Sequence, residues 1–145
     1  MAGFAAKGLA PEQPCPCGGG AYGRCCRPLH RQEQRAATAE QLMRSRYSAF
    51  ALAEIEHLLR TQPSQEPLAQ RRRALAASCR QLRWCGLEIL ASEAGGQDDL
   101  EGSVTFAAHY SAGAQRGVLR ERSRFGREGG LATGAWLYLE ALELS

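Results

Sequence analysis

Four of the chain's six cysteines lie within twelve residues, in the segment PEQPCPCGGGAYGRCC at positions 11–26. Proline and glycine crowd this segment, so neither a regular helix nor a strand is expected there. Neighbouring Cys25 and Cys26 have Cα atoms about 3.8 Å apart, too close for an unstrained disulfide. Bridges from this pair to Cys15 and Cys17 would close two very small stacked loops. The first residues contain no apolar run typical of an export signal, so we expect reduced thiols and a cytoplasmic protein.

A bound metal ion would use all four thiols. Zn²⁺ takes four thiolates in a tetrahedron at about 2.3 Å, and such a closed shell marks a structural site because no position is left for water. Iron and iron–sulfur clusters also accept four thiolates, so iron remains the alternative metal. The glycine run 18–20 lets the backbone turn sharply beside the sulfurs. We therefore predict a structural metal site, with Zn²⁺ favoured, whose ligands are Cys15, Cys17, Cys25 and Cys26.

The next part of the chain carries the signals of one long helix. Thr38 suits the N-cap, and Gln41 stands at the capping-box position. No proline or glycine interrupts residues 38–60, and Pro63 is expected to end the helix. Placing side chains at 100° intervals gives the helix one broad apolar face. Its members are Met43, Tyr47, Phe50, Ala51, Leu52, Ile55, Leu58 and Leu59.

A shorter helix and four strands complete the pattern. The helix is expected over residues 66–79, after the break PSQEP. The loops between the strands are too short for crossover helices, so neighbouring strands should be antiparallel. Helices followed by such a sheet predict an α+β fold. The four strands are expected over residues 84–90, 104–110, 118–125 and 135–142.

Several blocks of the sequence resemble known families. CPCGGGAYGRCC is similar to the SEC-C metal knuckle, best known from the C-terminal tail of SecA, although the loop between Cys17 and Cys25 is one residue shorter than usual and Gly19 stands where serine is common. CCRPLH, TAEQLMRSRYSAFALAE, RWCGLEIL, VTFAAHY and LRERSRFGRE resemble the bacterial YchJ family. The resemblance implies a SEC-C-like knuckle over residues 1–35 and a nuclear transport factor 2-like domain over residues 36–145. Such a domain is a cone whose curled antiparallel sheet wraps around the long helix and leaves a pocket at its open end.

Two charged residues fall on apolar faces. Arg44 lies within the apolar face of the long helix. In the third strand, alternation places Glu121 and Ser123 on the inward face, while the arginines of that strand point the other way. Because charges are rarely buried without a partner, we expect Arg44 and Glu121 to meet inside the cone or at its mouth, with Tyr47 and Ser48 nearby. A structural ion pair is the favoured interpretation, and a ligand-binding or catalytic pair is the alternative.

The histidines and the remaining cysteines carry weaker signals. His30 could replace a cysteine ligand or orient one, but a surface position is favoured. His57 falls on the polar side of the long helix and is expected to be exposed, and His109 is expected to face solvent or the polar flank of the helices. Cys79 and Cys85 are expected to be small buried apolar side chains.

The charge is nearly balanced. Residues 1–35 hold five Lys/Arg and two Asp/Glu, and residues 36–145 hold thirteen of each, which gives a net charge of +3 with neutral thiols. Four thiolates around Zn²⁺ would reduce this to about +1, which is not the charge of an electrostatic nucleic-acid binder. No stretch approaches the ~20 apolar residues of a membrane span.

Three classes of function remain. The leading one is a non-enzymatic adaptor whose knuckle docks a protein and whose cone binds a peptide or small ligand. The SEC-C knuckle of SecA meets a chaperone and the ribosome, so the resemblance implies a partner in protein export or translation. The second class is a small-molecule enzyme of the isomerase or cyclase type, for which the sequence offers no clear acid–base pair. The third is RNA binding through the basic knuckle, to which the arginine-rich second helix would add.

Overall fold

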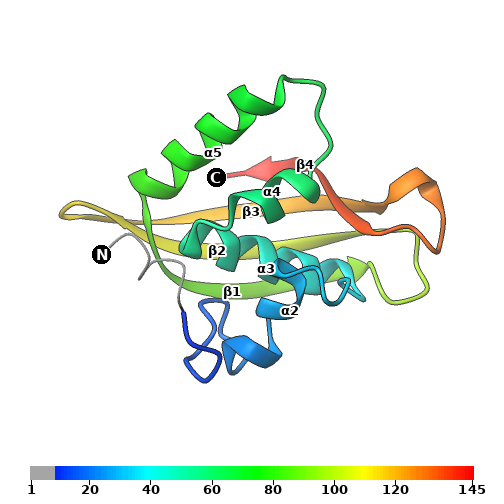
Figure 1. The fold of residues 1–145 in the computed structure, drawn as a ribbon, viewed down its shortest axis with the longest axis horizontal. Helices are drawn as coiled ribbons and strands as arrows, with labels where there is room; N and C mark the ends of the chain where they lie inside the picture. The colour runs from blue at the N-terminus through cyan, green and yellow to red at the C-terminus, as the bar shows by residue number, and fades with distance from the viewer. Residues whose placement is uncertain (1–8) are drawn as a thin grey trace.

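The computed structural model describes residues 9–145, so the first eight residues of the predicted segment 1–35 lie outside it (Figure 1). The cysteine-rich part contains a 3-10 turn, η1 (Tyr22–Arg24), and a short helix, α2 (Arg27–His30). Pro14 and Ala21 form an isolated antiparallel bridge that closes the glycine-rich turn. A backbone hydrogen bond from the Cys15 N–H to the Gly20 carbonyl oxygen, at 2.8 Å, holds the same turn. The segment is therefore ordered although it contains almost no regular secondary structure.

The predicted long helix is two helices. It begins as α3 (Ala39–Leu52), capped by the Thr38 hydroxyl, which accepts a hydrogen bond from the Gln41 N–H. The chain then turns at Ala53, which has φ 59° and ψ 42°, and continues as α4 (Ile55–Arg60). The expectation of one unbroken helix is wrong, because this left-handed residue redirects the chain without a glycine or proline. The turn allows α4 to pack back against α3, where Leu58 is buried.

Helix α5 and the sheet agree closely with expectation. Helix α5 (Leu68–Gln81) has no buried residue. The strands are β1 (Arg83–Ala94), β2 (Glu101–Ala112), β3 (Gln115–Arg127) and β4 (Trp136–Leu144), followed in order across one antiparallel sheet. A second 3-10 turn, η2 (Glu128–Gly130), joins β3 to β4. The predicted α+β class and antiparallel sheet are confirmed.

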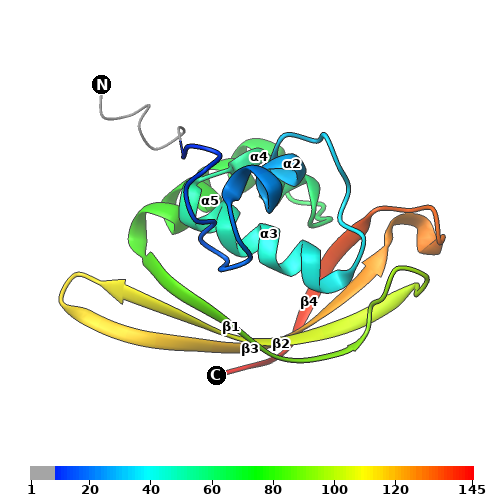
Figure 2. The ribbon, with the colours of Figure 1, turned by 90° about the horizontal axis from the view of Figure 1, so that it is seen from below.

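The sheet is curled, and the helices lie on its concave side (Figure 2). Register shifts interrupt β1 and the pairing of β3 with β4, and such irregularities bend and twist strands. The convex face is charged: Arg122 pairs with Glu93 and Glu143, and Arg124 pairs with Glu101 and Glu140. The alternation predicted for β3 is therefore confirmed.

One cluster of buried side chains joins the cysteine-rich segment to the cone. It includes Cys15, Cys17, Tyr22 and Cys26 together with residues of α3 and of the sheet. The Trp136 indole N–H in β4 also donates to the carbonyl oxygen of Ala37, at 3.1 Å. The proposed division between residues 35 and 36 stays a prediction, but the two segments share a hydrophobic core. Among residues 9–145, no helix is long and apolar enough to cross a membrane.

Candidate metal centre and cone pocket

The four predicted ligand cysteines come together. The four sulfur atoms all lie within 4.8 Å of one another; they belong to Cys15, Cys17, Cys25 and Cys26. The Cys17 sulfur is 3.4 Å from that of Cys25 and 3.7 Å from that of Cys26, and the last two are 3.9 Å apart. A tetrahedron of thiolates at about 2.3 Å from a zinc ion has sulfurs about 3.8 Å apart. The thiol cluster therefore fits a metal ion with four sulfur ligands.

Gly19 allows this close approach. A Cβ atom at residue 19 would lie 2.8 Å from the Cys25 sulfur and 3.2 Å from the Cys17 sulfur. A serine, which is common at this position of the knuckle, would have to displace the thiols of this shorter loop. The flanking Gly18 and Gly20 both have positive φ, which a residue with a side chain adopts at a cost.

The electrostatics of the thiol cluster also favour a cation. Hydrogen bonds with Cys15 and Cys26 lower the pKa of Cys17. Burial raises the pKa of Cys25 to about 12, and hydrogen bonds with Cys15 and Cys17 raise that of Cys26. Without a cation only part of the cluster would ionise near neutral pH. A metal ion supplies the positive charge that four neighbouring thiolates need.

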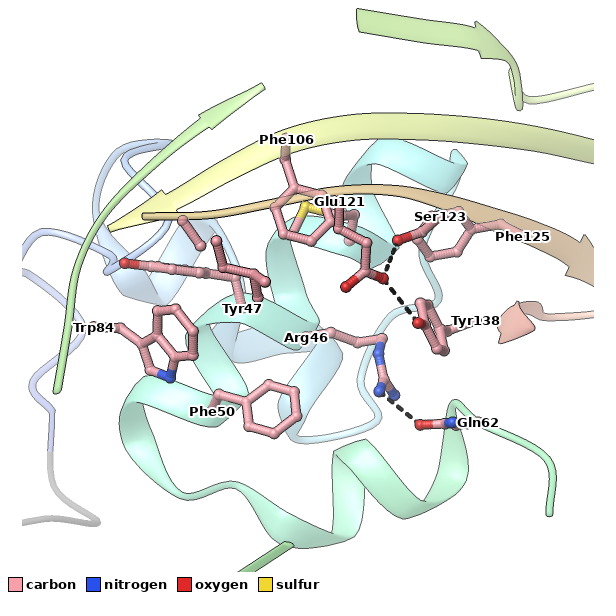
Figure 3. A pocket seen from close by; sticks show the side chains of 13 residues that line it. Arg46, Tyr47, Phe50, Gln62, Trp84, Phe106, Glu121, Ser123, Phe125 and Tyr138 are labelled. Atoms are coloured by element: carbon pink, nitrogen blue, oxygen red, sulfur yellow. Dashed lines mark hydrogen bonds between the residues drawn. The ribbon is translucent and has the colours of Figure 1, made fainter. Parts of the chain in front are cut away.

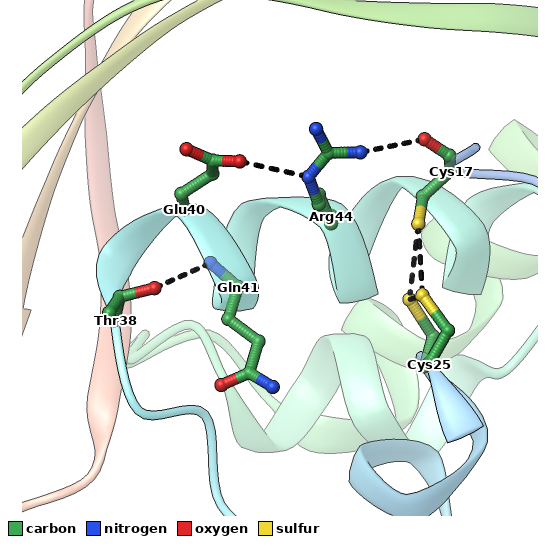
Figure 4. Close-up of polar contacts among 7 residues, drawn as sticks. Cys17, Cys25, Thr38, Glu40, Gln41 and Arg44 are labelled. Carbon is green, nitrogen blue, oxygen red and sulfur yellow. Dashed lines mark hydrogen bonds and ion pairs between the residues drawn. The ribbon is translucent and has the colours of Figure 1, made fainter. Parts of the chain in front are cut away.

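Arg44 attaches the cluster to α3, rather than pairing with Glu121 as expected (Figure 4). Its Nε donates to Glu40 at 3.0 Å, and its Nη1 donates to the carbonyl oxygen of Cys17 at 2.9 Å. Burial lowers the pKa of Arg44, but the Glu40 carboxylate and the Cys17 side chain together outweigh it, so the net pKa is raised. The predicted pairing of Arg44 with Glu121 is wrong, because α3 is covered on two sides and Arg44 faces the knuckle.

Two histidines expected at the surface are buried instead. His30 accepts or donates at both ring nitrogens, with the Tyr22 hydroxyl at 2.7 Å and the carbonyl oxygen of Ser45 at 2.9 Å. The Ser45 hydroxyl donates to the Leu42 carbonyl oxygen and lies 2.8 Å from His57 Nε2. Ser45 therefore accepts the Nε2–H of a neutral His57. Burial lowers the pKa of His57 to about 3.

Among residues 9–145, two buried polar side-chain atoms have no hydrogen-bond partner: His57 Nδ1 and Trp84 Nε1.

The expectations for His109, Cys79 and Cys85 are met only in part. His109 is half-exposed beside Glu88, as expected. Cys79 is partly buried, whereas Cys85 is exposed, so the expectation of a buried Cys85 is wrong.

The cone encloses a second candidate site, a cavity of about 280 Å³ between α3 and the sheet. Its wall is mostly aromatic and aliphatic, and Figure 3 shows these side chains around the cavity. The lining residues are Met43, Arg46, Tyr47, Phe50, Gln62, Trp84, Phe106, Ala108, Leu119, Glu121, Ser123, Phe125 and Tyr138.

Arg46 brings a positive charge to one end of the cavity. It is 7% exposed and donates to the Leu58 carbonyl oxygen at 3.1 Å, to the Thr61 hydroxyl at 2.7 Å and to Gln62 at 3.0 Å. Its guanidinium carbon lies 4.8 Å from the centre of the Tyr138 ring. Burial lowers the pKa of Arg46 to about 10, so the side chain is still charged at neutral pH.

Glu121 brings the opposite charge. Its Oε2 accepts hydrogen bonds from the Ser123 hydroxyl at 2.5 Å and the Tyr138 hydroxyl at 2.8 Å. Burial and the contact with Glu121 raise the pKa of Tyr138, so this hydroxyl remains a donor. Tyr138 thus connects the carboxylate of Glu121 with the guanidinium of Arg46, and together they form the polar end of the pocket.

Three of the five predicted pocket residues line this cavity: Tyr47, Glu121 and Ser123. Arg44 faces the knuckle, and the Ser48 hydroxyl contacts His30 and the carbonyl oxygen of Ser45. Sequence reasoning missed Arg46. The available signal was its spacing, because a residue four positions before Phe50 shares its side of a helix.

Comparison with known proteins agrees with this arrangement. Residues 38–141 match the family model described as the YchJ, middle NTF2-like domain. A UPF0225 protein of Ralstonia nicotianae is 44% identical over 136 residues, which cover 90% of this chain and 92% of the relative. A UPF0225 protein of Streptomyces coelicolor is 42% identical over 132 residues, covering 90% and 95%.

Two solved structures are similar to this chain in fold, and the description of each names a SEC-C motif. A SEC-C motif containing protein from Rhodopseudomonas palustris, solved in solution, has a TM-score of 0.74 and 29% identity over 92% of this chain and all of that one. The crystal structure of such a protein from Psychrobacter arcticus has a TM-score of 0.73 and 27% identity over 90% of this chain and 82% of that one. The chain therefore belongs to the YchJ (UPF0225) family, with a SEC-C cysteine cluster joined to an NTF2-like domain.

Proposed function

We propose that this protein is a non-enzymatic adaptor whose Zn²⁺ knuckle docks a protein partner and whose cone binds a small ligand. The observation that carries the proposal is the saturated thiol cluster: all four sulfurs face one another, and three of the four cysteines are buried. A closed four-thiolate shell leaves no open position for catalysis. The metal would instead fix the shape of the surface above it.

The cysteine-rich segment exposes several arginines. Arg24, Arg31 and Arg35 are exposed and Arg27 is half-exposed, and none of them forms an ion pair within residues 9–145. Unpaired surface charges steer association with a partner of opposite sign. We infer that the partner presents an acidic protein surface. The resemblance to SEC-C knuckles makes the export and translation machinery the first place to look for it.

A charge-reversal experiment tests whether the knuckle docks a protein partner. Metal-loaded protein is immobilised beside two triple variants, Arg24→Glu/Arg27→Glu/Arg31→Glu in the knuckle and Arg73→Glu/Arg80→Glu/Arg83→Glu on and after α5. Captured proteins from nuclease-treated lysate are quantified by mass spectrometry, and each candidate is purified and titrated. We expect to capture an acidic protein that binds the wild type and the α5 variant equally well. It should bind the knuckle variant at least tenfold more weakly.

RNA binding is the competing outcome. Capture that occurs from untreated lysate and is lost after nuclease treatment would contradict the adaptor proposal, because RNA would then carry the interaction. Salt dependence alone does not separate the two, since an acidic protein surface and RNA phosphates are both screened by salt. Equal binding by both triple variants would contradict a docking role for the knuckle.

A small-molecule enzyme of the isomerase or cyclase type is the second candidate. The observation that favours it is the carboxylate of Glu121 in an apolar cavity, next to the Tyr138 hydroxyl. Such a pair could exchange a proton with a bound molecule. Turnover of a bound compound that is lost in Glu121→Gln would favour this candidate over simple binding.

A further inference from the structure

The polar end of the cone pocket is electrically neutral but incompletely bonded. Arg46 and Glu121 contribute one charge of each sign, and Tyr138 contacts both. The guanidinium has acceptors in Leu58, Thr61 and Gln62. The pair is therefore compensated without any bound molecule.

One oxygen of the carboxylate is left over. Oε2 of Glu121 holds both recorded hydrogen bonds, and Oε1 has no partner among residues 9–145. Figure 3 shows the Glu121 carboxylate directed into the cavity, with Tyr47, Phe50, Trp84 and Phe106 around the remaining space. A carboxylate oxygen in apolar surroundings gains substantially from a hydrogen-bond donor.

The charge balance restricts what that donor can belong to. An ammonium or carboxylate ligand would add an uncompensated charge to a cavity whose own charges already cancel. Such a charge is costly to transfer from water into apolar surroundings. A hydroxyl or an uncharged N–H satisfies Glu121 Oε1 without this cost. The aromatic wall favours a flat apolar body for the rest of the molecule.

We propose that the cone binds an uncharged aromatic or alicyclic molecule whose hydroxyl or N–H group donates to Glu121 Oε1. This inference rests on the ligand-binding part of the proposed function and does not depend on docking by the knuckle. It also names the specificity determinants: Glu121 selects for the donor, and the Arg46–Glu121 pair selects against charge.

Four probes with one ring system test the proposal: 2-naphthol, 2-methoxynaphthalene, 2-naphthoate and 2-(aminomethyl)naphthalene. Binding to the metal-loaded full chain is measured by calorimetry and by the amide shifts of β3 at neutral pH. We expect 2-naphthol to bind at least about tenfold more tightly than each of the others, because only it offers an uncharged donor. Equal or tighter binding of the methoxy, anionic or cationic probe would overturn the proposal, as would no binding of any probe.

Glu121→Gln supplies the internal control. It leaves Arg46 without its counter-charge, so the preference should shift toward 2-naphthoate by at least tenfold relative to 2-naphthol. The matched change Glu143→Gln, on the convex face beside Arg122, should leave all four affinities within twofold. An unchanged preference in folded Glu121→Gln would overturn the role of Glu121; if that variant does not fold, the four-probe ranking of the wild type decides alone. Failure here leaves the charge-reversal docking experiment unaffected, so the two proposals fail separately.

Discussion

The thiol cluster and the polar end of the cone pocket both bury polar groups, but they differ in how completely those groups are bonded. In the cluster the sulfurs face one another, Arg44 holds the Cys17 carbonyl oxygen, and both ring nitrogens of His30 have partners. In the pocket, Glu121 Oε1 has no partner among the described residues. Glu121 is only partly buried and lines the cavity, so its free oxygen can accept a hydrogen bond from a bound molecule. On this difference we base the proposal of a structural role for the first region and a binding role for the second.

Removing the metal ion should have the largest effect on the stability of the protein, and it should act on the thiol cluster first. In Cys17→Ser/Cys25→Ser we expect loss of the bound ion and more than ~3 kcal/mol of stability, because metal binding and folding are coupled in such sites. The shared hydrophobic core should transmit part of this loss to the cone. Native mass spectrometry measures the metal, and thermal melts measure stability.

The control for this experiment is Cys79→Ser/Cys85→Ser, whose thiols lie outside the cluster. It should retain the metal. A metal that persists in the Cys17/Cys25 variant would show that the cluster is not the binding site.

Acid should destabilise the helical side of the molecule next. The pKa of His57 is lowered from its ordinary value of 6.5 to about 3, mainly by burial and further by the nearby charges of His30, Arg60 and Arg46. The unfolded chain therefore binds the extra proton between pH 6.5 and 3, and stability falls as the pH falls through this window, by up to about 1.4 kcal/mol per pH unit. Denaturant melts of wild type and His57→Gln at pH 7 and pH 4.5 measure this. Equal slopes with pH in both proteins would contradict a buried neutral His57.

Replacing Arg44, which links α3 to the cysteine-rich segment, should have a smaller effect on stability. Arg44→Met removes the hydrogen bond to the Cys17 carbonyl oxygen and the ion pair with Glu40, which should cost about 1–2 kcal/mol. The metal affinity should fall while naphthol binding stays unchanged. Arg72→Met, which removes an exposed ion pair with Glu56, is the matched control and should have almost no effect.

Changing the pocket carboxylate should have the smallest effect on stability. Glu121→Gln is expected to alter the unfolding free energy by less than about 1 kcal/mol. The amide oxygen can still accept from the two hydroxyls that Glu121 holds, and Arg46 keeps its other three acceptors. Because Arg44 and Glu121 do not meet, the double variant Arg44→Met/Glu121→Gln should show additive changes. A coupling larger than about 1 kcal/mol in thermal melts would contradict the separation of the two sites.

Local patterns of the sequence were sufficient for the cysteine cluster, the Thr38 cap and the four strands, because each depends on spacing or on alternation within a few residues. The break at Ala53 could not be found this way. A left-handed alanine is unfavourable by itself and is held by the packing of α4 on α3. No glycine or proline marks the position.

The faces of α3 were harder to predict than its existence. The knuckle covers one side and the sheet another, so two inward-facing arginines have different environments. The apolar face of the predicted helix favoured Arg44 as the pocket residue, whereas Arg46 lines the pocket in the structure. Burial of His30 and His57 likewise depends on Tyr22 and Ser45, partners that local periodicity cannot bring together.

The difference between the two regions is tested most directly by hydrogen–deuterium exchange on one sample of wild-type protein under two perturbations. Chelation should speed exchange first in residues 14–30 and the beginning of α3, with the strands β3 and β4 responding least. Saturating 2-naphthol should slow exchange in β3 and β4 and leave residues 14–30 unchanged. If chelation exposes the pocket strands as much as the cysteine-rich segment, or if naphthol protects both regions alike, the separation into a structural cluster and a binding pocket is contradicted.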